Sequence, residues 1–501
     1  MLAELYKPSL ALLTDLYELT MAYGYWRSGL AERQAVFHLA FRDNPFQGGY
    51  AVACGLEIAA EYLKSLRFDA GDLEYLGTLR GGDGAPLFET DFLDFLAGLR
   101  WDCDLDAVPE GTLVFPHEPL VRVRGPIITS QIVESALLNV VNFQTLVATK
   151  AARVVAAARG EPVLEFGLRR AQGIDGAVSA ARAAYVGGAA ATSNVLAGRL
   201  FGIPVRGTHA HSWVMCFADE PAAFRAYAAA MPGNSIFLVD TYDTIAGVHH
   251  AVEVARHIRE QGREMLGIRL DSGDLAELSI QAREILDRAG FPDAVIVASS
   301  DLDEHAISKL KEQGARIAVW GVGTRLVTGH DDPALGGVYK LTAVRDGQGP
   351  WQDKIKLSEQ EVKSSIPGIL QVRRHIRDGR PVGDVIYDER HPPGDECAMV
   401  ELVGGGRSGA AVSPSNGTLG QETFPAGTPF EDLLVPVFRG GRRVYPSPSL
   451  DESRRRARQQ LAVFGDEVKR LNAPAVYPVG LEVGLGRRLA EMIQTERKAE
   501  P

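Results

Sequence analysis

The chain has 501 residues, 46% of them hydrophobic and 23% charged, with a formal net charge of −11. This length exceeds what one hydrophobic core usually fills, so two or three domains are expected. The acidic balance offers no basic surface, which argues against a nucleic-acid-binding protein, and no nucleic-acid partner is expected.

The four cysteines are widely spaced and form no CxxC pair, which argues against a zinc or disulfide framework and predicts a reducing, cytoplasmic location. The apolar run Leu10–Leu13 meets Asp15 and Glu18 too early for a signal peptide. The most apolar helix-like run, residues 137–152, contains asparagine, glutamine and lysine. We therefore expect no segment that spans a membrane.

The first part of the chain, to about residue 135, has a mixed pattern. Leu56–Leu66 has helical spacing, whereas Glu110–Arg124 alternates apolar and polar residues between glycines and prolines. Such alternation is typical of antiparallel strands.

From about residue 160 to 345, apolar strands alternate with helices. Helices are predicted at Thr244–Arg259, Ala276–Ala289 and Glu304–Gln313, the last two with Gly290 and Gly314 as C-terminal caps. Repeated β-α units with short connections predict a parallel sheet, and about seven of them favour a barrel. The predicted strands are Pro162–Leu168, Pro204–Thr208, Ser235–Val239, Met265–Leu270, Ala294–Ala298, Arg316–Trp320 and Gly337–Leu341.

After about residue 380 the pattern becomes irregular. Gly404–Gly409 is predicted to be a loop, and the basic run Glu452–Arg458 is predicted to be the solvated face of a late helix.

Polar residues follow six of the predicted strands. In a parallel barrel these strand ends share one face, so the side chains can converge on one cavity. Taken alone, Asp271–Asp274 and Ser299–Asp303 can also be explained as helix N-caps, but six sets together are hard to explain in this way. The residues are Phe166, Arg169 and Arg170; His209 and His211; Asp240, Thr241 and Asp243; Arg269 and Asp271–Asp274; Ser299, Ser300, Asp301 and Asp303; and Gly321–Thr324.

The chemistry of these residues suits an anionic ligand. Gly321–Thr324 offers main-chain N–H groups and a hydroxyl to a phosphate, and Arg169 and Arg269 can hold phosphate or carboxylate. Asp271 and Asp301 can accept sugar hydroxyl protons or bind Mg²⁺. No P-loop motif is present, and no GxGxxG follows a strand.

Nine segments together resemble nicotinate phosphoribosyltransferases, in that family's order. They are Leu12–Met21, Phe41–Phe46, Asn142–Lys150, Glu165–Gly173, Thr192–Gly198, Gly207–Ser212, Arg269–Asp274, Gly321–Thr324 and Lys354–Ser358.

The resemblance implies an α/β fold: an α/β sandwich domain (1–135) beside an incomplete parallel (β/α) barrel (136–375). A C-terminal extension (376–501) is expected to return partly to the sandwich and to end in helices. The implied reaction joins nicotinate to 5-phosphoribosyl-1-pyrophosphate, giving nicotinate mononucleotide and pyrophosphate, and is coupled to ATP hydrolysis with Mg²⁺. A homodimer with a shared active site is also implied.

The resemblance assigns residue roles. His211 matches the phosphorylated histidine of the family and, with Arg269 and Asp271, is expected to be catalytic, whereas His209 occupies a variable position. Tyr17 from the neighbouring subunit and Phe166 are expected to stack on the pyridine ring. The other expected substrate-binding residues are Arg169, Thr192, Ser193, Ser299, Asp301, Gly321, Gly323 and Thr324.

Two segments depart from the family pattern: Gly187–Ala191 in a turn, and Arg325 where many members have Asn. The alternatives are a nicotinamide-using relative, a quinolinate-using relative, and a non-catalytic protein that senses nucleotides. The neutral residues Thr192–Asn194 suit a carboxylate better than an amide, and the quinolinate enzyme is shorter. A barrel aldolase is not favoured, because no predicted strand ends in a lysine placed for Schiff-base chemistry.

Overall fold

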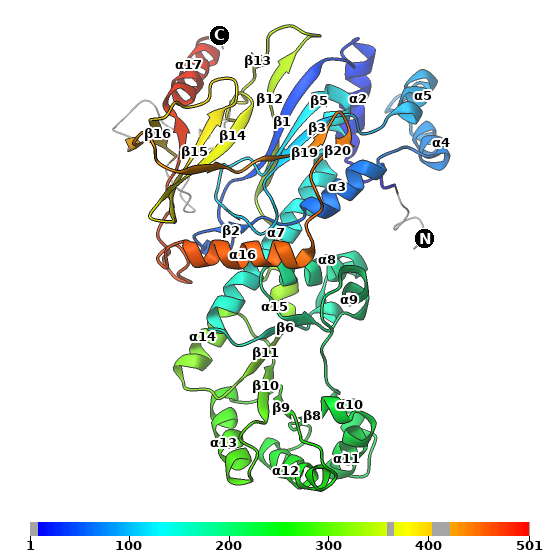
Figure 1. Ribbon diagram of the computed structural model, residues 1–501. Helices are drawn as coiled ribbons and strands as arrows, with labels where there is room; N and C mark the ends of the chain where they lie inside the picture. The colour runs from blue at the N-terminus through cyan, green and yellow to red at the C-terminus, as the bar shows by residue number, and fades with distance from the viewer. Residues whose placement is uncertain (1–8, 358–364, 403–420, 500–501) are drawn as a thin grey trace. The chain divides into compact units, whose positions relative to one another are not determined.

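The computed structural model describes residues 9–357, 365–402 and 421–499. Two compact units are present: unit 1 comprises residues 1–145 and 334–501, and unit 2 comprises residues 146–333 (Figure 1). Unit 2 is thus inserted into unit 1. Residues 136–145 and 334–375, expected in the barrel domain, belong to unit 1. Ser358 and the predicted loop Gly404–Gly409 lie outside the described residues.

Unit 2 contains a six-stranded sheet in which every neighbouring pair is parallel. Its strand order is β7-β6-β11-β10-β9-β8, so β7 and β8 are the two edges and the sheet is not a closed barrel. The strand expected at Pro204–Thr208 is reduced to one bridge between Thr192 and Val205. The strands are β6 (Val163–Glu165), β7 (Ala191–Thr192), β8 (Ile236–Leu238), β9 (Gly267–Leu270), β10 (Val295–Ser299) and β11 (Val319–Val322).

The three predicted helices of unit 2 are confirmed as α12, α13 and α14. Asp243, Asp274 and Asp303 each accept a main-chain N–H as the N-cap of one of them, as the residue type predicts. Gly290 and Gly314 follow α13 and α14 with φ of +85° and +80°. The helices of unit 2 are α8 (Gly173–Val186), α9 (Val195–Phe201), α10 (His211–Met215), α11 (Glu220–Ala230), α12 (Thr244–Glu260), α13 (Leu275–Arg288), α14 (Glu304–Glu312) and α15 (Thr324–Val327), with short 3₁₀ turns η2 (Leu168–Arg170) and η3 (Pro232–Asn234).

Helix α7 (Glu134–Ala157) contains the boundary between the two units. Contrary to the expectation from sequence, Ile127–Ala157 is long and apolar enough to cross a membrane by length and composition. However, 61% of the apolar window is buried inside the protein, as in the core helix of a soluble protein. The buried side chains of Lys150 and Arg153 form ion pairs with Glu304.

The first sheet of unit 1 has seven strands in the order β13-β12-β1-β5-β3-β19-β20, paired antiparallel. The expectation that Gly337–Leu341 is a barrel strand is wrong, because this segment is part of β12 and pairs antiparallel with β1. An apolar strand does not carry the identity of its partner in its own sequence. The strands are β1 (Gln34–Phe41), β3 (Asp104–Ala107), β5 (Val121–Pro126), β12 (Gly337–Arg345), β13 (Gln352–Asp353), β19 (Val435–Arg439) and β20 (Arg442–Arg443); β2 (Ala51–Val52) and β4 (Leu113–Val114) form a separate antiparallel pair.

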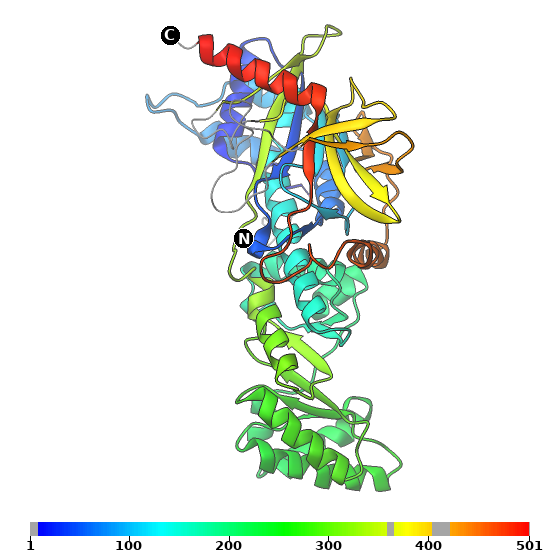
Figure 2. The same ribbon diagram turned by 90° about the vertical axis from the view of Figure 1, so that its left-hand side faces the viewer.

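Residues from 370 onward form all six strands of a second sheet of unit 1, in the order β17-β16-β21-β15-β14-β18. Strands β14 and β15 lie beside the first sheet (Figure 2), where Leu370 N–H donates to His38 and Arg122 donates to the Leu370 carbonyl. The strands are β14 (Leu370–Arg377), β15 (Arg380–Asp388), β16 (Cys397–Glu401), β17 (Gln421–Phe424), β18 (Phe430–Asp432) and β21 (Val479–Glu482).

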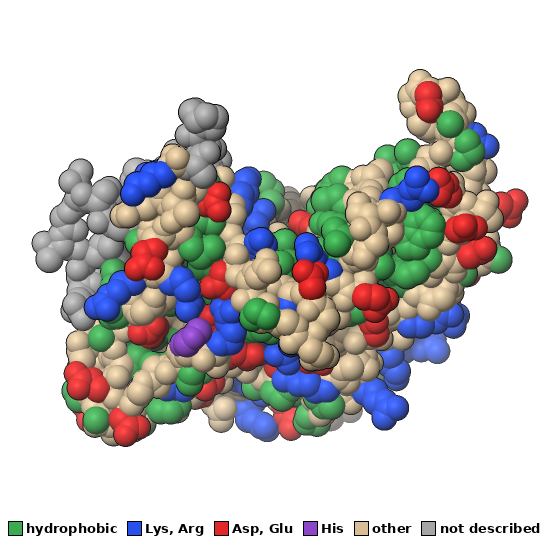
Figure 3. All heavy atoms as spheres, turned by 90° about the horizontal axis from the view of Figure 1, so that it is seen from above, with side chains coloured by type: hydrophobic (Ala, Val, Ile, Leu, Met, Phe, Trp, Pro, Cys, Tyr) green, Lys and Arg blue, Asp and Glu red, His purple; other side chains and the backbone are tan. Residues whose placement is uncertain are grey.

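The helices of unit 1 lie before, between and after the strands of its two sheets in the chain. The late basic run lies on α16, and the described chain ends in α17, so the expected terminal helices are present. On the face of the molecule in Figure 3, acidic and basic side chains are interspersed, and neither sign dominates. The helices are α2 (Leu16–Arg27), α3 (Leu56–Ser65), α4 (Ala70–Thr78), α5 (Thr90–Gly98), α6 (Ile127–Gln131), α16 (Leu450–Val463) and α17 (Val483–Ala499), with the 3₁₀ turn η1 (Pro45–Gln47).

Candidate functional site

Arg269, on β9, links three of the strand ends of unit 2. Its Nε donates to Ser299 Oγ (2.7 Å), its Nη1 to Thr208 Oγ1 (3.0 Å) and to the His209 carbonyl (3.3 Å), and its Nη2 to Asp271 Oδ1 (3.0 Å). A guanidinium has five N–H donors, so one remains for a ligand. The side chain is 15% exposed. Arg269 therefore holds the three strand ends together and still has one N–H group available to a ligand.

Asp271 lies beside Arg269 and receives two side-chain donors. Burial raises the pKa of its carboxyl group, but the hydrogen bonds from Ser299 and Arg269 outweigh burial and lower the pKa overall. The carboxylate is consequently ionised at neutral pH. It can hold hydroxyl groups or stabilise a nearby positive charge.

His211 is the first residue of α10. Its Nδ1 is 3.2 Å from Thr241 Oγ1, and its Nε2 is 3.9 Å from Asp271 Oδ2. The side chain is 40% exposed, so solvent or a substrate can reach the ring. His211, Arg269, Asp271 and Ser299, all expected site residues, are thus brought together.

Asp240, which follows β8, was noticed as a strand-end residue but assigned no role from sequence. Its Oδ2 accepts from the Asp271 N–H (2.9 Å) and from Ser272 Oγ (2.6 Å). Its Oδ1 is buried and has no hydrogen-bond partner among the described residues. Asp240 thus holds the loop that carries Asp271, and only the fold reveals this contact.

The position of Phe166 explains why residues 321 and 323, both expected to bind phosphate, are glycines. A Cβ on Gly321 would lie 2.7 Å from Phe166 Cδ2, and a Cβ on Gly323 would lie 3.0 Å from the Phe166 carbonyl oxygen. The Arg269 guanidinium carbon lies 5.9 Å from the centre of the Phe166 ring. Gly321 therefore makes room for the Phe166 ring, and Gly323 makes room for the Phe166 main chain.

Thr192 is buried and is engaged within the protein. Its hydroxyl donates to Glu165 Oε2 and accepts from the Asn194 N–H (2.9 Å). Burial raises the pKa of Glu165, although hydrogen bonds from Thr192 and from the Gly167 N–H oppose this. The neighbouring Ser193 is half-buried and has no side-chain partner among the described residues. Ser193 is thus the freer of the two expected hydroxyls.

Like Thr192 and Ser193, three further expected residues make no contact with the Arg269 network within the described ranges. Arg169 is exposed on η2, and Thr324 is the exposed first residue of α15. Asp301 pairs with Nε of Arg325 (2.9 Å), and Arg325 also pairs with Asp303 (3.1 Å). The unusual Arg325 therefore ties the loop after β10 to the loop after β11.

Tyr17 lies on α2 of unit 1, whereas the other expected residues lie in unit 2. The side chain is 46% exposed. Burial and the nearby carboxylates of Glu134 and Glu18 raise its pKa to about 12. The hydroxyl is therefore protonated at neutral pH, which suits a stacking ring.

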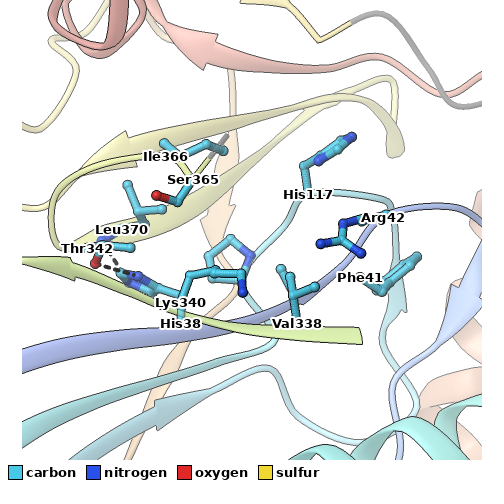
Figure 4. A pocket seen from close by; sticks show the side chains of 12 residues that line it. His38, Phe41, Arg42, His117, Val338, Lys340, Thr342, Ser365, Ile366 and Leu370 are labelled. Carbon is cyan, nitrogen blue, oxygen red and sulfur yellow. Dashed lines mark hydrogen bonds between the residues drawn. The ribbon is translucent and has the colours of Figure 1, made fainter. Parts of the chain in front are cut away.

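Unit 1 contains a pocket that sequence reasoning missed (Figure 4). The cationic side chains of Arg42 and Lys340 line it together with His117, His38 and Ser365. Burial lowers the pKa of Lys340, although the carboxylate of Glu134 opposes this. Two cations in one pocket suit an anionic group. The one sign of this pocket in the sequence was Arg42, which lies in the segment Phe41–Phe46 that resembles the family.

No group of three or more His, Cys, Asp or Glu side chains in the described parts of the chain has the spacing of a metal site.

Comparisons with known proteins find similarity to one family along most of the chain. Sequence models described as the nicotinate phosphoribosyltransferase N-terminal domain, the nicotinate phosphoribosyltransferase family and the C-terminal domain match residues 12–142, 162–347 and 418–487. A nicotinate phosphoribosyltransferase of Bacillus subtilis is 44% identical over 475 residues, which cover 94% of this chain and 93% of that protein.

The human nicotinate phosphoribosyltransferase is 35% identical over 546 residues, covering 97% of this chain and 96% of the human protein. The crystal structure of human nicotinic acid phosphoribosyltransferase superposes with a TM-score of 0.81 at 33% identity, covering 95% of this chain and 99% of the other. The chain belongs to the nicotinate phosphoribosyltransferase family of enzymes.

Proposed function

We propose that this enzyme transfers the phosphoribosyl group of 5-phosphoribosyl-1-pyrophosphate to nicotinate, in the synthesis of NAD from nicotinate. The bond from C1 of the ribose to the pyrophosphate oxygen breaks, and a bond from C1 to the pyridine nitrogen forms. The observation that carries the proposal is the network of Arg269, Ser299 and Asp271 beside an accessible His211.

The network supports this chemistry through charge. Displacement at C1 passes through a state in which the ribose ring is positively charged, so catalysis depends on positioning and electrostatic stabilisation. Asp271 supplies a carboxylate that is ionised at neutral pH. The remaining N–H of Arg269 supplies a donor for the carboxylate of nicotinate.

We propose that ATP transfers a phosphoryl group to His211, and that hydrolysis of the phosphohistidine accompanies each turnover. The exposed ring and its contact with a neutral hydroxyl, Thr241, support this role. The added phosphate would bring negative charge to a site that contains Arg269. Mg²⁺ would enter with the substrate phosphates, because Mg²⁺ usually binds phosphates and a few carboxylates.

Nicotinate is favoured over nicotinamide by the neutral hydroxyl of Ser193. The nearby acidic residue, Glu165, is 1% exposed and accepts from Thr192 and Gly167. The Glu165 carboxylate is therefore not available to accept a hydrogen bond from the amide group of nicotinamide.

We also propose an opened (β/α) barrel for unit 2 and a cytoplasmic homodimer with a shared active site. The pairing of β6 with β11 joins the first and last strands of unit 2, as in a barrel. Exposed apolar side chains support a subunit interface. They are Val195 (70%), Leu196 (46%) and Leu200 (58%) on α9, and Leu16 (53%) and Tyr17 (46%) on α2.

The test is product formation from labelled nicotinate and 5-phosphoribosyl-1-pyrophosphate with Mg²⁺, with and without ATP. The wild type is expected to form nicotinate mononucleotide and to be stimulated by ATP. His211→Ala should lose the stimulation, and the exposed control His257→Ala on α12 should retain it. A preference for nicotinamide would overturn the substrate assignment. ATP stimulation that persists in His211→Ala would overturn the phosphohistidine.

A further inference from the structure

We infer that His209 is a positioning residue: its imidazole takes the place of a missing strand at the open edge of the unit 2 sheet and so fixes where His211 lies. This inference rests on the role proposed for His211. In the sequence analysis His209 was assigned no role, because it occupies a variable position of the motif.

The first observation is a hydrogen bond at the sheet edge. Strand β8 has one neighbour among the described strands, β9, and the Val239 N–H donates to the Arg269 carbonyl on that side (3.2 Å). Because N–H groups alternate in direction along a strand, the N–H of Leu238 points to the open side. Nε2 of His209 accepts from it at 3.2 Å. Leu238 is 0% exposed, so without His209 this donor would be buried and unpaired.

The second observation concerns the state of the ring. Since Nε2 accepts, the proton lies on Nδ1, which is 3.4 Å from the Ala210 carbonyl. His209 is 7% exposed, and its ring lies 4.7 Å from that of Tyr227 and 6.1 Å from that of Phe224. Burial lowers the pKa of His209 to about 4. The ring is therefore neutral, and its acceptor is available throughout the neutral range.

The third observation is that His209 contacts β8 and β9 at residues that are paired with each other in the sheet. Leu238 and Arg269 are register partners in β8 and β9. His209 accepts from the Leu238 N–H through its ring and from the Arg269 guanidinium through its carbonyl (3.3 Å).

His211 lies two residues further along the chain and reaches groups just beyond the same two strands. These are Thr241 after β8 and Asp271 after β9. Asn234 Nδ2 adds a hydrogen bond to the Gly207 carbonyl (2.9 Å) at the start of the segment. Anchoring at His209 therefore sets the height of His211 above the sheet.

The test compares two substitutions. His209→Phe keeps an aromatic ring against Tyr227 but removes the acceptor, whereas His209→Gln places Oε1 near the position of Nε2. We expect His209→Phe to lower kcat/KM for nicotinate mononucleotide formation roughly 10- to 100-fold, since small displacements of reacting groups have effects of this size. His209→Gln should remain within about threefold of the wild type, and His257→Phe serves as an exposed control.

A double-mutant cycle separates positioning from a general structural role. If His209 acts through His211, His209→Phe in a His211→Ala background should cost less than about threefold. An equal loss in both backgrounds, or wild-type kcat/KM for His209→Phe, would overturn the inference. His211→Ala alone reports on the proposed function, so the two failures are distinguishable.

Nitrogen-15 NMR of the wild type provides a measurement that does not depend on a folded variant. The expected result is an unprotonated Nε2 and a protonated Nδ1 on His209 at pH 7. A protonated Nε2 would overturn the inference, because such a ring cannot accept from Leu238.

Discussion

Ser299 contacts both charged groups of the network at once. Its Oγ accepts from Arg269 Nε (2.7 Å) and donates to Asp271 Oδ1. The hydrogen bond from Ser299 is the largest of the effects that oppose burial and lower the pKa of Asp271. Removing this hydroxyl should therefore change both the position and the ionisation of the carboxylate.

We predict that Ser299→Ala moves the acid limb of the pH profile of kcat/KM to higher pH. The pKa of Asp271 is lower in the folded protein than in the unfolded chain. The ionised carboxylate therefore stabilises the fold at pH values above the unfolded pKa, and this stabilisation is lost as pH falls through the folded pKa. The substitution should raise that folded pKa. Exposed Ser300→Ala is the control, and an unshifted acid limb in Ser299→Ala would contradict the argument.

We predict that Gly321→Ala raises KM for nicotinate roughly tenfold or more, because the added Cβ displaces the Phe166 ring by about 1 Å. Initial rates at varied nicotinate concentration measure this. Gly176→Ala on α8 is the matched control, since a Cβ there meets nothing within 4 Å. A wild-type KM in Gly321→Ala would show that Phe166 does not contact the pyridine.

The candidate site residues of unit 2 could be proposed from the chemistry of their side chains, but their contacts could not be predicted. Arg269, Asp271 and Ser299 end or follow the buried strands β9 and β10, and parallel strands bring such residues to one edge. The segment before His211 is instead largely exposed and forms an isolated bridge. The roles of Asp240 and His209 depend on hydrogen bonds to groups about 30 residues away. No local pattern encodes such a partner.

At the scale of elements, α7 and α14 are joined by a buried ion pair. Lys150 Nζ lies 2.8 Å from Glu304 Oε2, and both side chains are 0% exposed. Burial raises the pKa of Glu304, but Lys150 and Arg153 outweigh burial and lower it overall. The lysine that closes the Asn142–Lys150 motif therefore holds the part of α7 that lies in unit 2 to α14.

We predict that Lys150→Met lowers the free energy of unfolding by roughly 3 kcal/mol, because it leaves Glu304 buried with one cation fewer. Urea denaturation measures the loss, and exposed Lys309→Met on α14 is the control. A loss smaller than about 1 kcal/mol would indicate that water or Arg153 compensates.

The elements of unit 2 were more predictable than those of unit 1. Helices α12 to α14 carry their own N-cap aspartates, and two of them their C-cap glycines, which are local signals. Strand β12 carries only an apolar pattern, so its antiparallel pairing with β1, about 300 residues earlier, could not be derived. The second sheet of unit 1 was missed for the same reason.

For the whole molecule, Glu118 in the core of unit 1 makes stability depend on pH. Burial raises the pKa of this 0% exposed carboxyl group, and the charge of Asp384 raises it further. A raised folded-state pKa means that the contribution of Glu118 is fully present below the unfolded pKa and is lost as pH rises through the folded pKa.

We predict that Glu118→Gln makes the free energy of unfolding less dependent on pH over the range from about pH 4.5 to neutral pH, because the carboxyl group of the unfolded chain ionises there and the amide does not. Urea denaturation across this range measures the slope. Exposed Glu61→Gln on α3 should keep the wild-type slope. Parallel curves for Glu118→Gln and the wild type would contradict the prediction.

The proposed shared active site makes a prediction for mixtures of subunits. Tyr17→Ala and His211→Ala should each have low activity, but mixed dimers contain one site in which both residues are intact. An equal mixture should recover roughly a quarter of the wild-type activity if subunits exchange at random. Activity no higher than the mean of the two variants would exclude a shared site, provided that exchange is confirmed by mass spectrometry.

The insertion of unit 2 into unit 1 has a consequence for synthesis on the ribosome. Strands β1, β5 and β3 emerge early, but β12 and β19, which flank them, come from residues 337–345 and 435–439. Unit 2 is contiguous and can fold while the first strands still have two uncovered edges. Such edges pair readily with other chains. A transcript truncated before residue 435 would therefore yield a polypeptide with an intact unit 2 and a permanently open edge at β3, a species prone to aggregate.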